Sequence, residues 1–150
     1  MRSPFLQRFT ELPNLLPIFP LSGVVVLPGV QLPLNIFEPR YLAMVQAALA
    51  SDHLIGMVQP RSREADDQHP AIHQVGCAGR ITSYSETNDG RIILVLTGLC
   101  RFNVREELPE QEGFRRIVPN WEGFAQDLQD GDDEDALSER DLFMGSLRAF

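Results

Sequence analysis

The sequence predicts a mainly β domain that also contains one packed helix, a β+α fold. Short apolar segments interrupted by prolines fill residues 15–34, and proline within such segments is typical of edge or kinked strands because it removes a ladder donor. Two longer apolar segments flank Asn88-Asp89-Gly90, which is the pattern of a β-hairpin. A helical repeat of apolar residues lies between these two regions, at residues 39–50.

The N-terminal part is expected to hold two strands. Residues 1–14 show no periodicity and are expected to be irregular. Within residues 15–34, the run Val24-Val25-Val26-Leu27 supplies β-branched bulk. Pro28-Gly29 then marks a turn between the two strands.

The helix is expected to begin at Glu38-Pro39-Arg40-Tyr41 and to end near Ser51. Proline suits the first helical turn, where its missing N–H has no intrahelical partner, and a glutamate there faces the positive end of the helix dipole. A short strand at residues 54–59 and a polar loop at residues 60–70 follow.

The hairpin is expected to consist of residues 75–85 and 91–104. A three-residue turn sets a register in which Cys77 and Cys100 are cross-strand neighbours, directly opposite or one step apart. Two packed thiols are favoured over a disulfide, because a reducing compartment keeps cysteines as small apolar side chains.

The C-terminal part is expected to contain a strand at residues 114–124, an acidic linker at 127–133 and an amphipathic helix at 134–150. The β domain is therefore expected to span residues 15–126. The helical pattern reaches the last residue without a stop signal, so we expect residues 134–150 to be the start of a longer, truncated helical region.

Composition restricts the classes of protein to which the chain can belong. Its 150 residues suit one soluble domain, with 43% hydrophobic and 23% charged residues. The formal net charge is −8, of which −6 falls in residues 127–150, so neither part favours a nucleic-acid backbone. No apolar run approaches the roughly 20 residues that cross a bilayer. We expect a cytoplasmic protein, without a signal peptide, that binds neither nucleic acid nor membrane; the sequence leaves the number of subunits open.

Residues that could support catalysis or hold a cofactor are few. All 13 basic residues are arginine, so a P-loop lysine, a Schiff-base lysine and a Ser–Lys dyad are excluded. No GxSxG motif occurs. His69 and His73 lie four residues apart, but Pro70 between them opposes the helical geometry that a metal site at this spacing needs. We predict neither a catalytic site nor a metal or other cofactor.

Several motifs together resemble one known family. The motifs are Phe19-Pro20-Leu21, Val26-Leu27-Pro28-Gly29, Leu32-Pro33-Leu34-Asn35-Ile36-Phe37-Glu38-Pro39-Arg40-Tyr41, Val75-Gly76-Cys77-Ala78-Gly79-Arg80-Ile81 and Gly98-Leu99-Cys100-Arg101-Phe102-Asn103-Val104. Over about residues 15–122, their order and spacing resemble the N-terminal, substrate-binding domain of Lon (ATP-dependent protease La).

This resemblance implies a PUA-like, mostly antiparallel pseudo-barrel with one packed helix, followed by a helical subdomain. In full-length Lon proteases the domain helps to capture substrates and precedes an ATPase module and a Ser–Lys protease module. It also occurs in cereblon and in small bacterial proteins that contain little else, and the chain looks most like these bacterial proteins. Without lysine the chain departs from the catalytic part of the family, and any peptidase label would rest on homology alone.

Two groups of residues are candidates for binding. The first is a possible peptide-binding surface of apolar side chains, although each of these could instead fill the core. It consists of Phe19, Val26, Leu32, Leu34, Phe37 and Trp121. The second is the block Glu38, Pro39, Arg40 and Tyr41, for which a structural role at the helix start is favoured over a binding role.

The function that follows is a non-catalytic protein- or peptide-binding module that resembles the substrate-recognition domain of Lon proteases. Its expected partners are polypeptide segments, or a protease or regulatory protein for which it acts as adaptor or regulator. The alternative is a PUA-like domain that binds a small molecule or RNA, and the acidic charge argues against RNA. A hydrolase of unrecognised type would need a nucleophile beside a base in a cleft.

Overall fold

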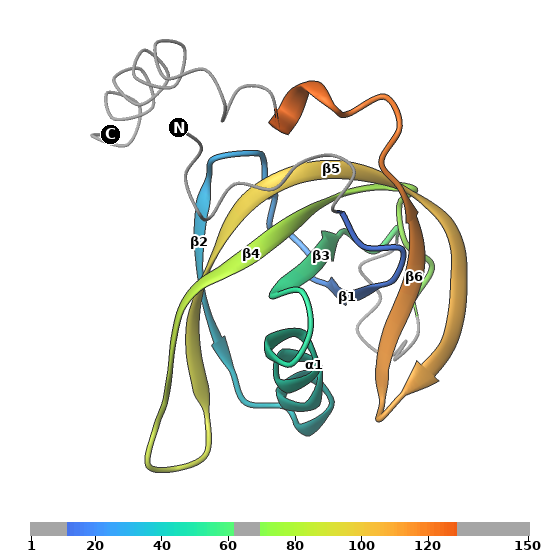
Figure 1. Ribbon diagram of the computed structural model, residues 1–150. Coiled ribbons are helices and arrows are strands. Elements are labelled where there is room, and N and C mark those ends of the chain that lie inside the picture. Colours follow the sequence, from blue (N-terminus) through green and yellow to red (C-terminus); the bar gives the residue numbers. More distant parts are fainter. Residues whose placement is uncertain (1–11, 62–69, 129–150) are drawn as a thin grey trace, which may run out of the picture.

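The computed structural model describes residues 12–61 and 70–128, which form a β sheet with one helix (Figure 1). The predicted mainly β fold is confirmed. In chain order the elements are β1 (Leu16–Pro20), β2 (Gln31–Ile36), α1 (Pro39–Leu49), β3 (Leu54–Val58), β4 (Val75–Glu86), β5 (Ile92–Gln111) and β6 (Phe114–Asn120). The helix predicted for residues 134–150 lies outside the described residues.

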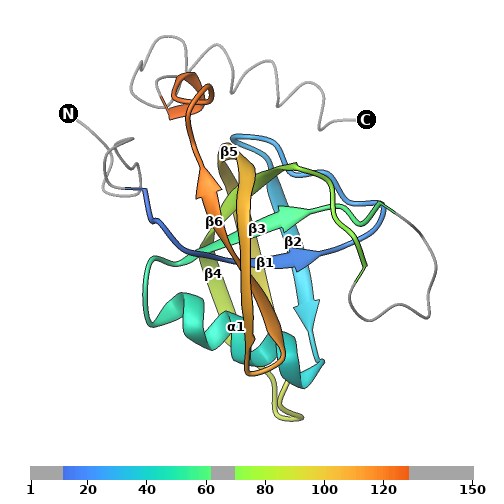
Figure 2. The same cartoon turned by 90° about the vertical axis from the view of Figure 1, so that its right-hand side faces the viewer.

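The strands close into a ring. They follow the order β2-β5-β4-β3-β1-β6, and β6 also pairs with β5. Strand β5 makes this closure possible because its 20 residues pair with β2 and β4 in the first half and with β6 in the second. β1 and β3 pair in parallel, and the other pairs are antiparallel. The helix α1 lies at one end of the ring, and residues 121–128 lie at the opposite end (Figures 1 and 2).

Two bulges of opposite sense shape the β4–β5 hairpin. One leaves Thr82 as an extra residue on β4, and the other leaves Leu99 as an extra residue on β5, so the register is restored beyond them. Cys77 therefore pairs with Arg101, and Cys100 pairs with Ala78, one step away from its fellow thiol. Successive side chains of a strand point to opposite faces. The two thiols thus lie in different core clusters and stay free.

The core is divided by the sheet into two clusters. One packs beneath α1, whose Met44, Val45 and Ala48 are fully buried. The other surrounds Phe102 near the opposite end of the ring, where Trp121 packs edge-on against it with ring centroids 5.8 Å apart. Residues that follow β6 therefore belong to the folded core.

The run Val24-Val25-Val26-Leu27 does not form the strand that its β-branched residues predict. It precedes β2 and crosses β5 at Gly98, whose N–H donates to the Val30 carbonyl at 2.8 Å. The Gly29 N–H donates to the Gly98 carbonyl at the same distance. A side chain at Gly98 would bring its Cβ within 1.9 Å of the Leu27 oxygen. Only glycine permits this crossing.

The second half of β5 and the turn into β6 also differ from the sequence prediction. The hairpin strand was predicted to end at Val104, but β5 continues to Gln111. Glu112 and Gly113 then form a two-residue turn, and both have positive φ, 51° and 87°. This is the backbone of a type I′ turn, which matches the twist of antiparallel strands. A Glu-Gly pair signals it weakly, because glutamate is unusual at positive φ.

Candidate functional site

The start of α1 forms one side of an open cavity of about 330 Å³, here called the α1 pocket. Six residues proposed from the sequence gather in it, namely Phe19, Leu34, Phe37, Glu38, Arg40 and Tyr41. Pro20, Leu21, Asn35 and Ile36 complete the lining, and all four lie within or beside the motifs that resemble the Lon domain. The structure thus brings together two groups of candidates that the sequence treated separately.

The connection between β2 and α1 explains why an aromatic residue is exposed there. β2 ends at Ile36 and α1 begins at Pro39, so Phe37 and Glu38 belong to neither element. Glu38 has an extended backbone, with φ −72° and ψ 135°, as the residue before a proline prefers. The chain therefore turns sharply after the sheet. Phe37 remains 65% exposed beside the pocket.

Aromatic packing orders the wall of the pocket. The rings of Phe19 and Tyr41 lie 4.3 Å apart and are tilted by 37°. The Arg40 guanidinium lies 4.6 Å from the centre of the Tyr41 ring on top of this pair. Burial raises the pKa of the Tyr41 hydroxyl, while nearby Arg40 opposes the shift. The hydroxyl therefore stays protonated at neutral pH and can donate a hydrogen bond.

The charged rim of the pocket contains both signs. Arg40 Nε donates to the Glu38 carboxylate at 3.1 Å, and both side chains are partly exposed. Such a pair contributes little to stability in water. Glu38 makes no side-chain hydrogen bond that caps the helix, so its contact with Arg40 shapes the rim instead.

The remaining apolar candidates lie elsewhere. Leu32 is half-buried and packs against the cluster beneath α1. Val26 is buried in the same cluster. Trp121 is buried at the far end of the ring, where its indole N–H donates to the Pro13 carbonyl at 2.9 Å. Val26 and Trp121 therefore pack in the core, and Val26 also belongs to the lining of a second cavity away from α1.

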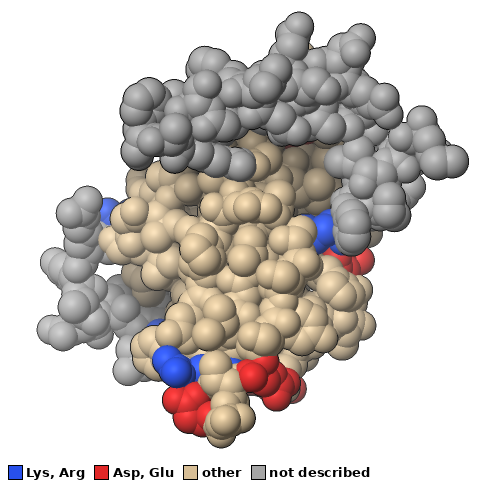
Figure 3. All heavy atoms as spheres, turned by 90° about the vertical axis from the view of Figure 1, so that its left-hand side faces the viewer, with Lys and Arg blue, Asp and Glu red and all other residues tan. Residues whose placement is uncertain are grey.

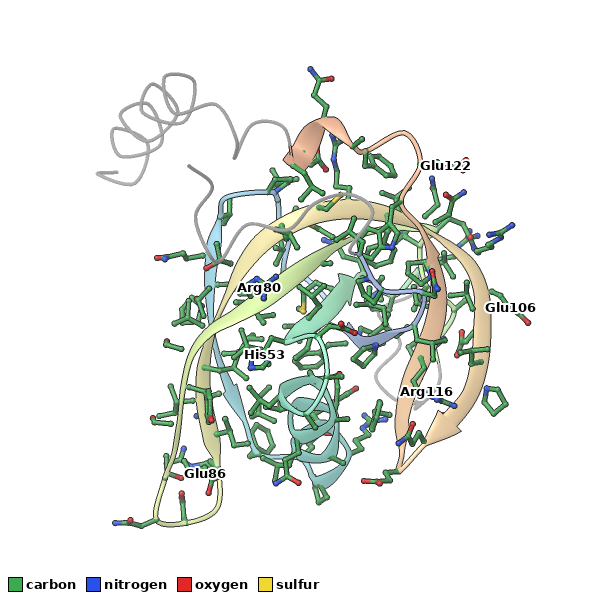
Figure 4. All side chains as sticks on the ribbon, in the orientation of Figure 1. His53, Arg80, Glu86, Glu106, Arg116 and Glu122 are labelled. Carbon is green, nitrogen blue, oxygen red and sulfur yellow. The ribbon has the colours of Figure 1, made fainter. Side chains whose placement is uncertain are left out.

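The two thiols of the described residues are poorly suited to nucleophilic chemistry. Burial raises the pKa of the Cys77 thiol to about 12 and that of Cys100 to about 12, which opposes thiolate formation. Within residues 12–61 and 70–128, no group of three or more His, Cys, Asp or Glu residues could hold a metal ion. The labelled acids Glu86, Glu106 and Glu122 lie at three different edges of the molecule (Figure 4).

Two further sequence expectations concern histidine and the membrane. His73 is exposed, and its proposed metal partner His69 lies outside the described residues. In the part of the chain that the structure describes, no helix has both the length and the apolar character to cross a membrane.

Comparison with known proteins gives consistent similarities. The model of the ATP-dependent protease La (LON) substrate-binding domain matches residues 15–146. Lon protease 2 of Myxococcus xanthus is 33% identical over 111 residues, which cover 73% of this chain and 13% of that protein. Lon protease of Anaeromyxobacter dehalogenans is 32% identical with the same coverage. The chain thus spans about an eighth of the length of these relatives, 13% in both.

Solved structures show the same fold. A Lon N-terminal domain protein from Xanthomonas campestris superposes with a TM-score of 0.57 and 31% identity, over 73% of this chain and 60% of that one. The N-terminal domain of the Mycobacterium avium complex Lon protease superposes with a TM-score of 0.55 and 18% identity, over 71% and 54%. The second likeness concerns the fold alone.

Proposed function

This chain belongs to the ATP-dependent protease La (LON) substrate-binding domain family, and we propose that it is a non-catalytic module that binds polypeptide segments at the α1 pocket. The exposed Phe37 side chain beside an aromatic-walled cavity carries the proposal. A concave site lined mainly by apolar and aromatic side chains, with a few polar groups at its rim, is typical of a ligand-binding surface.

The edge of β2 supports binding of an extended peptide. β2 is the last strand in the sheet order and pairs with β5 alone. The Gly98 N–H bonds to the Val30 carbonyl, so the alternation of the antiparallel ladder directs the backbone groups of Gln31, Pro33 and Asn35 away from β5. Pro33 therefore removes no ladder bond. Outward carbonyl and N–H groups remain for a peptide that adds to this edge.

The pocket lies next to this edge. Its lining includes Leu34 to Phe37 on one side and Phe19 to Leu21, at the end of β1, on the other. The face of the molecule over β2, β4 and β5 is almost free of charged side chains at its centre, and charges gather at its rim (Figure 3). A peptide paired with β2 could thus cross an almost uncharged face and insert an apolar side chain between the apolar wall of the pocket and its Glu38–Arg40 rim.

The test is a peptide array probed with the full chain, followed by fluorescence anisotropy on the peptides that bind. Phe37→Glu places a charge at the exposed anchor and is expected to weaken binding about tenfold or more. Tyr84→Glu is the matched control, because Tyr84 is 54% exposed on β4 and does not line the pocket. Absence of any bound peptide, or equal binding by Phe37→Glu and the unchanged chain, would refute the proposal.

The role of an adaptor or regulator of proteolysis, in the cytoplasm, is part of the same proposal. The relatives in which the domain is found are named Lon proteases, which supports a link to proteolysis. Addition of the full chain to a purified Lon protease should change the rate at which a peptide bound by the chain is degraded. Phe37→Glu should abolish that change. An unaltered rate would separate peptide binding from any regulatory role.

A further inference from the structure

A second cleft lies at the other end of β2. It has a volume of about 550 Å³ and is formed between residues 24–27 and the adjoining parts of β3 and β4, and we call it the 24–27 cleft. Val26 is buried and fixes this segment to the core, whereas Val25 is 64% exposed and Leu27 is also exposed. The Gly98 crossing described above fixes its C-terminal end. Residues 24–27 are therefore held in place by the core and by β5, and the wall of the cleft that they form is fixed.

Exposed apolar side chains are concentrated at this cleft. Seven large apolar side chains are exposed among the described residues, and three of them, Val25, Leu27 and Val75, line it. Met57, Val58 and Cys77 add buried apolar surface. Such concentration distinguishes a binding surface from the scattered exposed side chains of an ordinary surface.

The polar lining of the cleft has the opposite sign to the protein. Arg61, His73 and Arg101 line it, and no aspartate or glutamate belongs to the described lining. The whole chain carries a net charge of −8. Arg61 Nε donates to the Ile72 carbonyl at 3.0 Å, which holds this guanidinium at the rim. Arg61 therefore favours an anionic group in the ligand, whereas Arg101 already has the carboxylate of Asp127 as its partner.

Arg101, at one edge of the cleft, binds the carboxylate of Asp127. Arg101 donates through Nε and a terminal nitrogen to the two oxygens of Asp127, at 3.0 and 2.9 Å. The Arg101 backbone N–H also donates to Asp127, at 2.9 Å. Paired contacts of this kind are specific for carboxylate geometry. Arg101 is therefore already paired within the chain, and Arg61 is the lining arginine that remains for the carboxylate of a ligand.

Backbone donors are available in the same segment. The structure records no backbone hydrogen bond donated by Val24, Val25, Val26 or Leu27 to any residue in 12–61 or 70–128. The Val24 carbonyl accepts from the Gln59 side chain at 3.1 Å, which holds the start of the segment beside β3. Unpaired N–H groups beside exposed apolar side chains are what an extended peptide requires.

We propose that the 24–27 cleft is a second polypeptide site, which takes an apolar side chain that is flanked by an aspartate or glutamate. This inference rests on the proposed function only in that both ligands are polypeptide, since the two sites share no lining residue. Burial of apolar surface favours the apolar side chain of the ligand, and the arginine at the rim favours its carboxylate. A chain with alternating acidic and apolar residues can present both to the cleft.

The test uses the full chain and three short fluorescent peptides. The first alternates aspartate with leucine, the second has lysine in place of each aspartate, and the third has serine in place of each leucine. The first peptide should bind at least tenfold more tightly than either of the others. Only this peptide offers both an apolar side chain for the lining of the cleft and a carboxylate for its rim. Octanoate is added separately as a small amphiphilic carboxylate.

Two variants locate the binding, and a third serves as control. Val25→Glu introduces a like charge at the exposed wall, and Arg61→Gln removes a cation from the rim; each should weaken the first peptide about tenfold. Tyr84→Glu is the matched control, since Tyr84 is 54% exposed against 64% for Val25 and lines neither cavity, and Phe37→Glu reports on the α1 pocket. Thermal unfolding of each variant verifies that the fold is retained.

The outcomes separate this inference from the proposed function. Loss of acidic-peptide binding in Val25→Glu but not in Phe37→Glu supports the second site, whether or not the α1 pocket binds anything. Loss in Phe37→Glu alone overturns it and leaves the first proposal standing. Equal binding of the aspartate and lysine peptides also overturns it. If octanoate binds as tightly as the peptide and displaces it, the ligand is a small carboxylate and the polypeptide assignment fails.

Discussion

The two ends of β2 carry apolar surfaces that arise in different ways. At its C-terminal end, most of the α1 pocket is built by neighbours in sequence, because Leu34 to Tyr41 turn the chain from strand to helix, and Phe19 of β1 adds the ring that packs on Tyr41. At its N-terminal end, the 24–27 cleft is built by a contact between residues far apart, where Leu27 passes over Gly98. The first surface has charges of both signs, whereas the charged residues in the lining of the second are arginines, one of which is paired with Asp127. Local chemistry thus fixes one site and tertiary packing fixes the other.

The largest expected effect concerns the thiol in the lining of the 24–27 cleft, for which the α1 pocket has no counterpart. Burial, aided by the charge of Asp127, raises the pKa of Cys77 to about 12. At pH 8 its thiolate fraction is then about a thousandfold below that of a free cysteine, whose pKa is about 8.5. Iodoacetamide should modify Cys77 in a Cys100→Ala variant slower by at least that factor than in the guanidinium-unfolded chain.

The same shift predicts a dependence of stability on pH. The folded pKa lies above the unfolded one, so the contribution of the thiol to stability is complete below about pH 8.5 and decreases as pH rises toward 12. Guanidinium titrations at pH 8 and pH 10.5 should show a smaller free energy of unfolding at the higher pH. Cys77→Ala should reduce the difference. A native thiol that is alkylated as fast as the unfolded one would show that the cleft lining is open to solvent.

Gly98→Ala should produce the next largest effect and should damage one end of β2 selectively. Its Cβ would meet a backbone oxygen that cannot move without breaking the crossing, so we expect a loss of about 3 kcal/mol in the free energy of unfolding. Gly79→Ala is the control, because its Cβ would lie 3.1 Å from a Leu96 side-chain atom, which can yield by a few tenths of an ångström. Chemical denaturation measures both variants, and equal losses would contradict the role given to the crossing.

The sequence predicts the C-terminal end of β2, at the α1 pocket, better than the N-terminal end, at the 24–27 cleft. The helix start, the β4–β5 turn and the neighbouring thiols follow from proline, glycine and period-two alternation, and the structure confirms all three; the Thr87 N–H, for instance, donates to the Arg91 carbonyl at 2.9 Å across the three-residue turn. Val24 to Leu27 have strand propensity but no strand partner, because the chain here crosses β5 at Gly98. Gly98 lies about seventy residues further along the sequence. Propensity cannot reveal such a contact.

The α1 pocket shows where single-residue reasoning from sequence is limited. Phe19 comes from β1, whereas Leu34 and Phe37 come from the end of β2 and the turn after it, and the sequence named all three without indicating that they meet. From the sequence, Trp121 is an equally suitable anchor. In the structure its indole N–H donates to the Pro13 carbonyl and its ring packs against Phe102. The sequence does not show whether the indole N–H of a tryptophan has a buried acceptor, and such an acceptor determines whether the side chain lies in the core or at the surface.

Tyr41→Ala tests whether the aromatic wall holds the other end of β2. Loss of the ring pair with Phe19 and of half-buried area should cost about 2 kcal/mol in the free energy of unfolding. Tyr41→Phe keeps the rings and should stay within about 0.5 kcal/mol of the unchanged chain. Binding to the α1 pocket should fall in Tyr41→Ala, while the acidic peptide should bind as before. A parallel loss at both sites would mean that the two ends of β2 are coupled.

Glu38→Gln should have the smallest effect, and it addresses the charges rather than the shape of the pocket. The carboxylate makes one partly exposed contact with Arg40 and caps no backbone group, so the free energy of unfolding should change by less than about 0.5 kcal/mol. The rim would then carry Arg40 alone and would approach the charge of the 24–27 cleft. If charge selects the ligand, the Glu38→Gln pocket should bind acidic peptides more tightly, with Val25→Glu in the background to silence the other site. Unchanged preference would show that the apolar wall alone selects ligands at the α1 pocket, in contrast to the cleft at the other end of β2.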